Sequence, residues 1–410
     1  MREVSTEPKL RFPNFNEAWK VFTLSELLEE HKTRNLNSDF DEVFSVAKQK
    51  GVVNQIEHLG RSYASDNISN YKVVFPNDIV YTKSPTANFP FGIIKLNRTN
   101  RTGVVSVLYA VFKPKSEVIG SLLELYFSSP INTFNCLVPI VNRGAKNTMN
   151  IGNLDFSNGI KICLPENPEE QLKISKYITE TDNLINLLSN KIDSLVEYKK
   201  GVVQQIFNQK IRFKKDDGSS FQDWKTLKVE SILKRYSNPV EVDSTQLYNE
   251  IGIKSHGKGL FHKPSVTGES LGNKRVFWIK ENALILNIVF AWERAVAKTS
   301  KKELGMIASH RFPMYEMIKG VADLDFILTF FLTPKGRHLL ELSSPGGAGR
   351  NKTLSQTDFE KLKIPIPCIE EQIKISNFLS ELENEIICFK FKLNQTLEYK
   401  KALLQQLFCK

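Results

Sequence analysis

The feature that most constrains this fold is a duplication within the chain. Residues 170–207 align with residues 371–408 at a constant offset of 201, and the aligned segments share Glu-Gln-x-Lys-Ile-Ser, Glu-Tyr-Lys-Lys and Gln-Gln-x-Phe. Further upstream, residues 144–156 resemble the segment 203 residues later, and Trp19-Lys20 resembles the dipeptide 205 residues later. Similarity at such a long period predicts that the chain is two half-proteins in tandem.

Each half ends in a segment that predicts a long helix. Pro168 suits a first helical turn, and Glu169 and Glu170 complement the positive end of the helix dipole. Apolar residues then recur at spacings of four and three. They include Ile174, Ile178, Ile185, Leu188, Ile192 and Leu195 in the first copy, and Ile375, Leu379, Leu382, Ile386, Phe389 and Leu393 in the second.

This spacing is the seam of a coiled coil, so we expect the two helices to pair within the chain along about 50 Å. The alternative is that each apolar stripe packs onto its own domain.

The segments between the helices predict mixed α/β domains. Residues 71–75, 79–81, 104–109 and 276–279 are strand-like, with turn residues beside them. Shorter stretches have helical period, namely 25–30 and 120–127. The short runs at 160–162 and 362–364 alternate apolar and polar residues before prolines, which indicates strands.

The positive charge of the chain is concentrated in two stretches. The net charge is +11. Residues 81–150 contain eight Lys and Arg against two Glu, and residues 251–311 contain eleven against four. Two basic patches favour a polyanionic partner such as DNA or RNA, although a basic soluble protein without such a partner has the same composition.

Composition also excludes several classes of protein. No run approaches the roughly 18 apolar residues of a membrane span, and the first residues lack a signal-peptide pattern, so we expect a cytoplasmic protein. The five cysteines are scattered, and neither they nor the six histidines have the spacing of a metal site. We expect reduced thiols and no bound metal.

One motif imitates a nucleotide-binding loop. Residues 252–259 read GIKSHGKG, but Gly259 replaces the Ser or Thr that binds magnesium, and Pro264 and Gly268 interrupt any following helix. Two interpretations stay open for this segment. It is either a glycine-flexible loop that brings His256 and Lys258 to DNA, or a plain hairpin.

Two enzymatic alternatives lack their motifs. A DNA methyltransferase needs a glycine-rich cofactor loop after a strand and an aromatic Pro-Pro tetrapeptide. The glycine-rich run at 344–349 instead begins with a proline turn. A nuclease needs an Asp and Glu-x-Lys cluster, which is not found. A coiled-coil scaffold without a role in DNA recognition is the remaining alternative.

The order of domain, long helix, domain and long helix resembles the specificity subunits of type I restriction enzymes over essentially the whole chain. In each half a Gly-Ala pair, a short strand and a proline precede the Glu-Gln-x-x-Ile helix start. Residues 253–261 and 290–295 resemble that family's second recognition domain, and residues 10–15 resemble its openings.

The resemblance implies two target-recognition domains, residues 1–165 and 211–367, separated by spacer helices at 166–210 and 368–410. The helices would form an antiparallel coiled coil with near-twofold symmetry, and each domain would read half of an interrupted DNA site. Two basic domains at a fixed spacing can reach groove segments more than one helical turn, about 34 Å, apart. Because the domains differ in sequence while the helices match, the two half-sites should differ.

The resemblance also implies partners and cofactors. The chain itself would be non-catalytic, and two methylating subunits and the restriction (translocase) subunits would join it on double-stranded DNA. S-adenosylmethionine, ATP and Mg would be bound by those partners and not by this chain.

Candidate DNA contacts lie in the two basic stretches and beside the Gly-Ala pairs. Most are expected to meet phosphates, because half or more of protein–DNA hydrogen bonds go to the backbone. Arg294 could instead read guanine or form a solvated pair with Glu293. The candidates are Lys83, Arg98, Arg101, Arg143, Lys146, Asn147, Ser255, His256, Lys258, Arg294, His310, Arg311, Arg350, Asn351 and Lys352.

Overall fold

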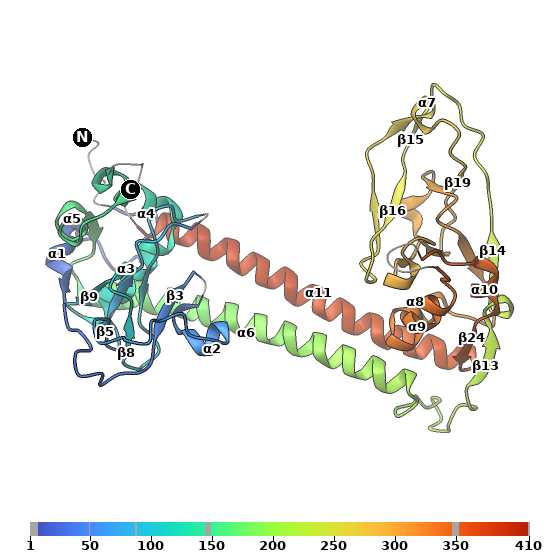
Figure 1. Ribbon diagram of the computed structural model, residues 1–410, viewed down its shortest axis with the longest axis horizontal. Helices are drawn as coiled ribbons and strands as arrows, with labels where there is room; N and C mark the ends of the chain where they lie inside the picture. Colours follow the sequence, from blue (N-terminus) through green and yellow to red (C-terminus); the bar gives the residue numbers. More distant parts are fainter. Residues whose placement is uncertain (1–6, 49, 87, 144–148, 347–351, 409–410) are drawn as a thin grey trace. The chain divides into compact units, whose positions relative to one another are not determined.

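The chain folds as two compact units in the computed structural model of the protein (Figure 1). The structure describes residues 7–48, 50–86, 88–143, 149–346 and 352–408. Unit 1 comprises Met1–Asn190 and Lys390–Lys410, and unit 2 comprises Lys191–Phe389. Each unit contains a globular segment and parts of both long helices, α6 (Pro168–Phe207) and α11 (Ile369–Gln406).

A four-stranded antiparallel sheet forms the centre of unit 1, in the order β2-β9-β6-β7. Among the described residues, shorter strand pairs, five short α-helices and one 3-10 helix accompany it. The strands are β1 (Lys20–Thr23), β2 (Leu28–Glu30), β3 (Phe44–Ala47), β4 (Gly51–Asn54), β5 (Lys72–Val74), β6 (Ile79–Tyr81), β7 (Ile94–Leu96), β8 (Gly103–Val105), β9 (Ala110–Pro114), β10 (Asn142–Arg143), β11 (Met149–Asn150) and β12 (Lys161–Leu164). The helices are α1 (Leu24–Leu27), α2 (Gln55–Leu59), α3 (Glu117–Ser128), the 3-10 helix η1 (Val138–Ile140) after α4 (Pro130–Leu137), and α5 (Asn153–Gly159).

Unit 2 has a four-stranded antiparallel sheet of the same topology, β14-β23-β20-β21. Its strands are β13 (Lys225–Lys228), β14 (Leu233–Tyr236), β15 (Leu247–Tyr248), β16 (Ile251–Ile253), β17 (Leu260–His262), β18 (Val266–Thr267), β19 (Val276–Trp278), β20 (Leu284–Leu286), β21 (Val296–Lys298), β22 (Ile307–Ser309), β23 (Met314–Met317) and β24 (Lys363–Ile366). Its helices are η3 (Val229–Ser231), α7 (Gly268–Leu271), η4 (Ala291–Glu293), η5 (Lys301–Glu303), α8 (Leu324–Leu332), α9 (Pro334–Leu342) and α10 (Gln356–Lys361). The prediction of mixed α/β domains is therefore confirmed.

Local sequence explains why the helix pair beside each sheet begins where it does. Ser116 accepts a hydrogen bond from the Ile119 amide to cap α3, and Asp323 caps α8 through the Phe326 amide. The next helix of each pair starts with a capping hydroxyl followed by proline, at 129–130 and at 333–334. The same signals at equivalent positions give both units the same helical layer.

Aromatic side chains fill the core of each unit. In unit 1, Phe156 stacks on Tyr81, with ring centroids 4.9 Å apart, and also contacts Phe112. In unit 2, Phe359 lies 5.3 Å from Tyr315 and 5.4 Å from Phe331. These rings are almost fully buried, and burial of each Phe stabilises the fold by roughly 1.5–3 kcal/mol.

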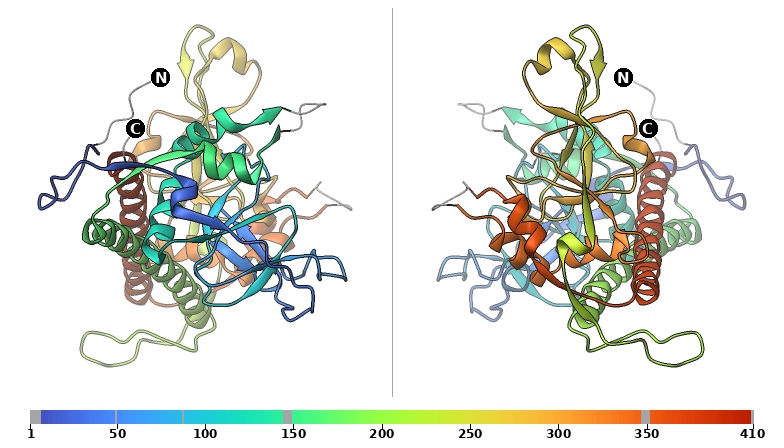
Figure 2. Two further views of the ribbon diagram at one scale, coloured as in Figure 1. Left: turned by 90° about the vertical axis from the view of Figure 1, so that its left-hand side faces the viewer. Right: turned by 90° about the vertical axis from the view of Figure 1, so that its right-hand side faces the viewer.

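The ends of both long helices contribute to these cores. In unit 1, Ile174 and Ile178 of α6 and Leu403 and Leu404 of α11 belong to one apolar cluster. Unit 2 reverses the order. There the end of α6, at 202–207, and the start of α11, at 375–382, share a cluster. Figure 2 shows that the helices lie along one side of each globule.

The predicted seam is the buried face of both helices. Ile174, Ile178, Ile192, Leu195, Ile375, Leu379, Leu382 and Ile386 are buried, and Ile185, Leu188, Phe389 and Leu393 are partly buried. Neighbouring apolar residues off the seam are exposed, including Leu187 and Ile387.

Polar contacts flank this seam within each unit. In unit 1 the hydroxyls of Tyr177 and Tyr399 are 2.6 Å apart, and Lys400 pairs with Asp182. In unit 2, Lys199 Nζ lies 2.6 Å from Glu383 Oε2. In both units, therefore, a segment of α6 contacts a segment of α11.

A buried ion pair fixes the start of each long helix. Arg11 donates to both carboxylate oxygens of Glu170, at 2.8 and 2.9 Å, and Arg212 donates to those of Glu371, at 3.2 and 2.8 Å. The glutamates are 1% and 0% exposed. Hydrogen bonding to Glu371 raises the pKa of Arg212, which keeps the guanidinium charged. These arginines were not among the residues singled out from the sequence.

Two local predictions are wrong. Residues 25–30 were expected to be helical, but α1 ends at Leu27 and β2 follows, because residues 28–30 pair with β9. The strand expected at 104–109 stops at Val105, and the Tyr109 amide then bonds to the Ser106 carbonyl in a turn before β9. In both cases sheet pairing or a turn overrides the local period. In the described part of the chain, no helix is long and apolar enough to cross a membrane.

Candidate nucleic-acid interface

Four loops of unit 2 meet around the segment that follows the central strand β20. We call residues 254–259, 287–294, 310–313 and 352–356 the unit 2 loop cluster. The His256 and Gly257 amides donate to the carbonyls of Glu293 and Arg294, at 2.8 and 3.0 Å. The Ile288 amide donates to the Arg311 carbonyl, and the Leu354 amide donates to the Ile288 carbonyl. The structure thus joins candidates from four separate parts of the sequence.

The segment that imitates a nucleotide-binding loop is the tip of the β16–β17 hairpin. His256, Gly257 and Gly259 all have positive φ, of 62°, 69° and 76°, which explains the glycines. Lys254, His256 and Lys258 are exposed on this tip. The segment is therefore the tip of a β-hairpin that presents cationic side chains, and its contact with DNA stays a prediction.

Beside the cluster lies a pocket of about 320 Å³, in which Arg275 is exposed and Arg235 is paired with Glu360. Its lining includes Arg235, Arg275 and His310, with the aromatic rings of Phe277 and Phe312. The His310 amide donates to the Arg275 carbonyl at 2.9 Å, and both residues and Arg311 are exposed. Arg275 was not among the sequence candidates, although its place beside Lys274 in a basic stretch could have suggested it.

Three candidates of this cluster hold the loops together. Ser255 Oγ donates to Glu293 Oε2 at 2.9 Å. Arg294 has a φ of 61°, donates to the Leu332 carbonyl at 3.2 Å and has a buried Nε. Lys352 pairs with Glu341 at 2.6 Å and lies 5.4 Å from the Trp292 ring centroid. These contacts shape the loops, so Arg294 does not form the solvated pair with Glu293 that one interpretation expected.

In unit 1, Lys83 lies in an inward-facing polar network. Its Nζ donates to Asn153 Oδ1 at 2.5 Å, and Asn153 donates to Glu30 Oε1 at 2.6 Å. Burial lowers the pKa of Lys83, and the nearby charge of Lys72 lowers it further. Lys83 therefore fixes α5 relative to the sheet.

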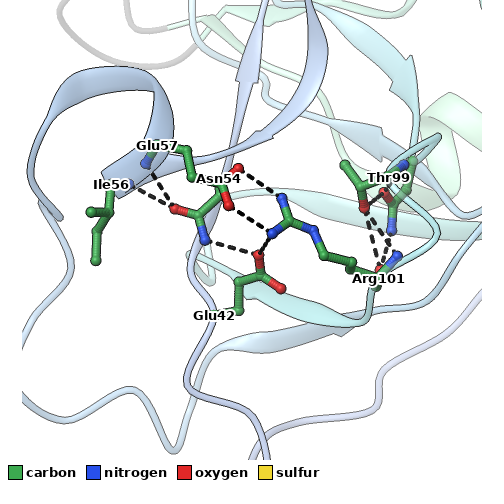
Figure 3. Close-up of polar contacts among 7 residues, drawn as sticks. Glu42, Asn54, Ile56, Glu57, Thr99 and Arg101 are labelled. Atoms are coloured by element: carbon green, nitrogen blue, oxygen red, sulfur yellow. Dashed lines mark hydrogen bonds and ion pairs between the residues drawn. The ribbon is translucent and has the colours of Figure 1, made fainter.

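Arg98 and Arg101 both have carboxylate partners. Arg98 Nε donates to Glu124 Oε2 at 2.8 Å. Arg101 bonds to both oxygens of Glu57, at 2.8 and 2.9 Å, and lies 2.7 Å from Glu42 (Figure 3). The hydrogen bond from Arg101 lowers the pKa of Glu57. A phosphate would have to compete with these carboxylates for either guanidinium.

The remaining candidates lie at the Gly-Ala segments. Arg143 is in β10, while Lys146, Asn147, Arg350 and Asn351 lie outside the described residues. Their contact with DNA stays a prediction. No cluster of His, Cys, Asp and Glu in the described ranges is suited to a metal ion.

Comparisons with known proteins agree with this picture. Residues 223–399 match the family described as the type I restriction modification DNA specificity domain. A protein of Methanocaldococcus jannaschii assigned as the MjaX type I restriction enzyme specificity subunit is 23% identical over 309 residues, 72% of this chain and 69% of that protein. The MjaVIII specificity subunit of the same organism is 25% identical over 275 residues, 62% of this chain and 61% of that protein.

The fold also has a counterpart among solved structures. A crystal structure of the S subunit of a type I restriction-modification system from M. genitalium aligns with a TM-score of 0.54 at 14% identity, covering 98% of both chains.

Residues 223–399 therefore carry a DNA specificity domain, and the fold of the chain resembles that of an S subunit. Residues 223–399 belong to the type I restriction modification DNA specificity domain family, and the relatives matched over more of the chain are type I restriction enzyme specificity subunits. The family resemblance expected from the sequence is confirmed. The relatives are specificity subunits of restriction enzymes, in agreement with the expectation that this chain is not itself an enzyme.

Proposed function

We propose that the chain reads an interrupted, asymmetric DNA site, with each unit reading one half. The observation that carries the proposal is the equal strand order of the two sheets, β2-β9-β6-β7 and β14-β23-β20-β21, in units whose loops differ in sequence. Two units with the same sheet topology can bind two half-sites of DNA in the same way. Loops that differ in sequence can then contact different bases in each half-site.

We further propose that α6 and α11 form an antiparallel coiled coil related by near-twofold symmetry. The reversed order of helix ends in the two apolar clusters supports this arrangement, as does the burial of the seam. Paired helices of about forty residues would set the spacing between the domains at 1–165 and 211–367.

The partners follow from this role. We propose that two methylating subunits and the restriction subunits assemble on the chain in the cytoplasm. S-adenosylmethionine, ATP and Mg would belong to those subunits, and this chain would bind none of them. A scaffold without DNA recognition would not need the exposed cationic hairpin and pocket of unit 2.

Duplex binding should depend steeply on salt. For six to ten phosphate contacts, the affinity is expected to fall by about 10³–10⁵ between 50 and 200 mM salt. The measurement is a titration of labelled duplex with the chain in complex with its methylating subunits. Absence of any duplex binding at low salt would favour the scaffold.

Domain exchange tests the assignment of half-sites. Replacing residues 10–165 with the equivalent segment of another specificity subunit should change one half of the methylated motif, because unit 2 keeps its loops. Methylation mapping of a host genome reads the motif directly. A change in both halves, or in neither, would contradict the domain assignment.

A further inference from the structure

The β3–β4 hairpin of unit 1 is the structural equivalent of the cationic β16–β17 hairpin of unit 2. Each hairpin follows a parallel bridge to the strand β8 or β22, formed by Val43 with Val104 and by Glu250 with Ile307. The backbone hydrogen bonds around these bridges also correspond. They are Val104 to Glu42 at 2.8 Å and Ile307 to Asn249 at 2.9 Å, then Gln55 to Val43 and Lys263 to Glu250, both at 2.9 Å.

The tips of the two hairpins share charge and position. Lys48 and Lys50 are exposed at the tip of β3–β4, as Lys254 and Lys258 are at the tip of β16–β17. Lys48 Nζ lies 5.7 Å from the ring centroid of Phe89, in the segment that joins β6 to β7. The unit 2 tip bonds to residues 293–294, in the segment that joins the corresponding strands β20 and β21. The same two loops therefore meet in each unit.

The charges of Lys48 and Lys50 are available to a ligand. Among residues described by the structure, neither lysine has a carboxylate within ion-pair distance. Lys50 Nζ instead lies 3.5 Å from His58 Nδ1. The other cations of unit 1 are already engaged, since Arg98 and Arg101 pair with glutamates and Lys83 donates to Asn153.

We propose that Lys48 and Lys50 contact the phosphates of the DNA half-site read by unit 1, as the β16–β17 tip does in unit 2. This inference rests on the proposed function. It names the residues of unit 1 that would contact the phosphates of its half-site. A two-stranded β-ribbon fits the major groove, and lysines at its tip then lie beside the phosphates that border the groove. Sequence reasoning placed the unit 1 contacts elsewhere, on Lys83, Arg98, Arg101, Arg143, Lys146 and Asn147.

The test compares salt dependence. The double variant Lys48→Ala/Lys50→Ala, in complex with its methylating subunits, is titrated onto a mixed-sequence duplex between about 50 and 200 mM salt. Loss of two phosphate contacts should reduce the slope of log K against log salt by about 1.8. Lys48→Arg/Lys50→Arg should keep the wild-type slope, because the charges remain.

A matched control removes the same charge elsewhere in unit 1. Lys161→Ala/Lys176→Ala replaces two exposed lysines of β12 and α6, and its slope should equal that of the wild type. Equal slopes for wild type and the hairpin variant, or equal losses in both double variants, would overturn the inference while the proposed function stands. Failure of the wild type to bind duplex DNA would instead overturn the proposed function.

Discussion

Replacing Arg212 with alanine is expected to lower the free energy of unfolding of unit 2 by about 3–5 kcal/mol. Glu371 is 0% exposed, and Arg212 supplies a hydrogen bond to each of its carboxylate oxygens, at 3.2 and 2.8 Å. Without the guanidinium, a carboxylate is left buried without its counter-charge at the start of α11. The expected loss of stability measures the cost of a buried, unpaired Glu371 carboxylate. It does not measure the net stabilisation by the Arg212–Glu371 pair.

Tryptophan fluorescence during urea unfolding measures this effect. Three of the four tryptophans lie in unit 2, and Trp224 packs against Phe207 and Phe326 in its core. Lys228→Ala is the control, since the Lys228–Glu230 pair is half exposed and such pairs contribute about 0–1 kcal/mol. The double variant Arg212→Met/Glu371→Met should be less destabilised than Arg212→Ala. Similar midpoints for Arg212→Ala and Lys228→Ala would contradict the role of the buried pair.

Long-range regularity made much of the fold predictable from the sequence. The repeat predicted two similar halves, and Pro168 with its following glutamates correctly marked the first turn of α6. The strand at 79–81 matches β6, because a short run of apolar residues beside a Pro-Asn-Asp turn has few alternatives. The two buried ion pairs also follow the repeat. Arg11 and Arg212 are 201 residues apart, as are Glu170 and Glu371.

The candidate site was less predictable, because contacts between distant residues decide which cations are available. Nothing near Arg101 in the sequence indicates Glu57, which is 44 residues away and reaches it only through α2. Lys48 and Lys50 were overlooked because they contribute little to the net charge of any long window. Their importance comes from the hairpin, which the Gly51 turn and the apolar residues on either side could have indicated.

Ile386→Asp is expected to destabilise the chain by at least about 3 kcal/mol, whereas Ile387→Asp should change stability by less than about 0.5 kcal/mol. Ile386 is 2% exposed and Ile387 is 54% exposed. The residues are adjacent in α11 and undergo the same substitution, so helix propensity cancels between the two variants. The difference in their urea midpoints, followed by circular dichroism, therefore reports burial at the seam.

Ile386 lies where the two long helices have no globular core beside them to bury it. It is absent from the apolar clusters of unit 2, yet the Lys199–Glu383 pair and the contact of Lys191 with Phe389 bring α6 alongside this part of α11. Burial at this position thus requires the partner helix. Equal midpoints for the two variants would mean that α6 and α11 do not pair here, which would contradict the proposed coiled coil.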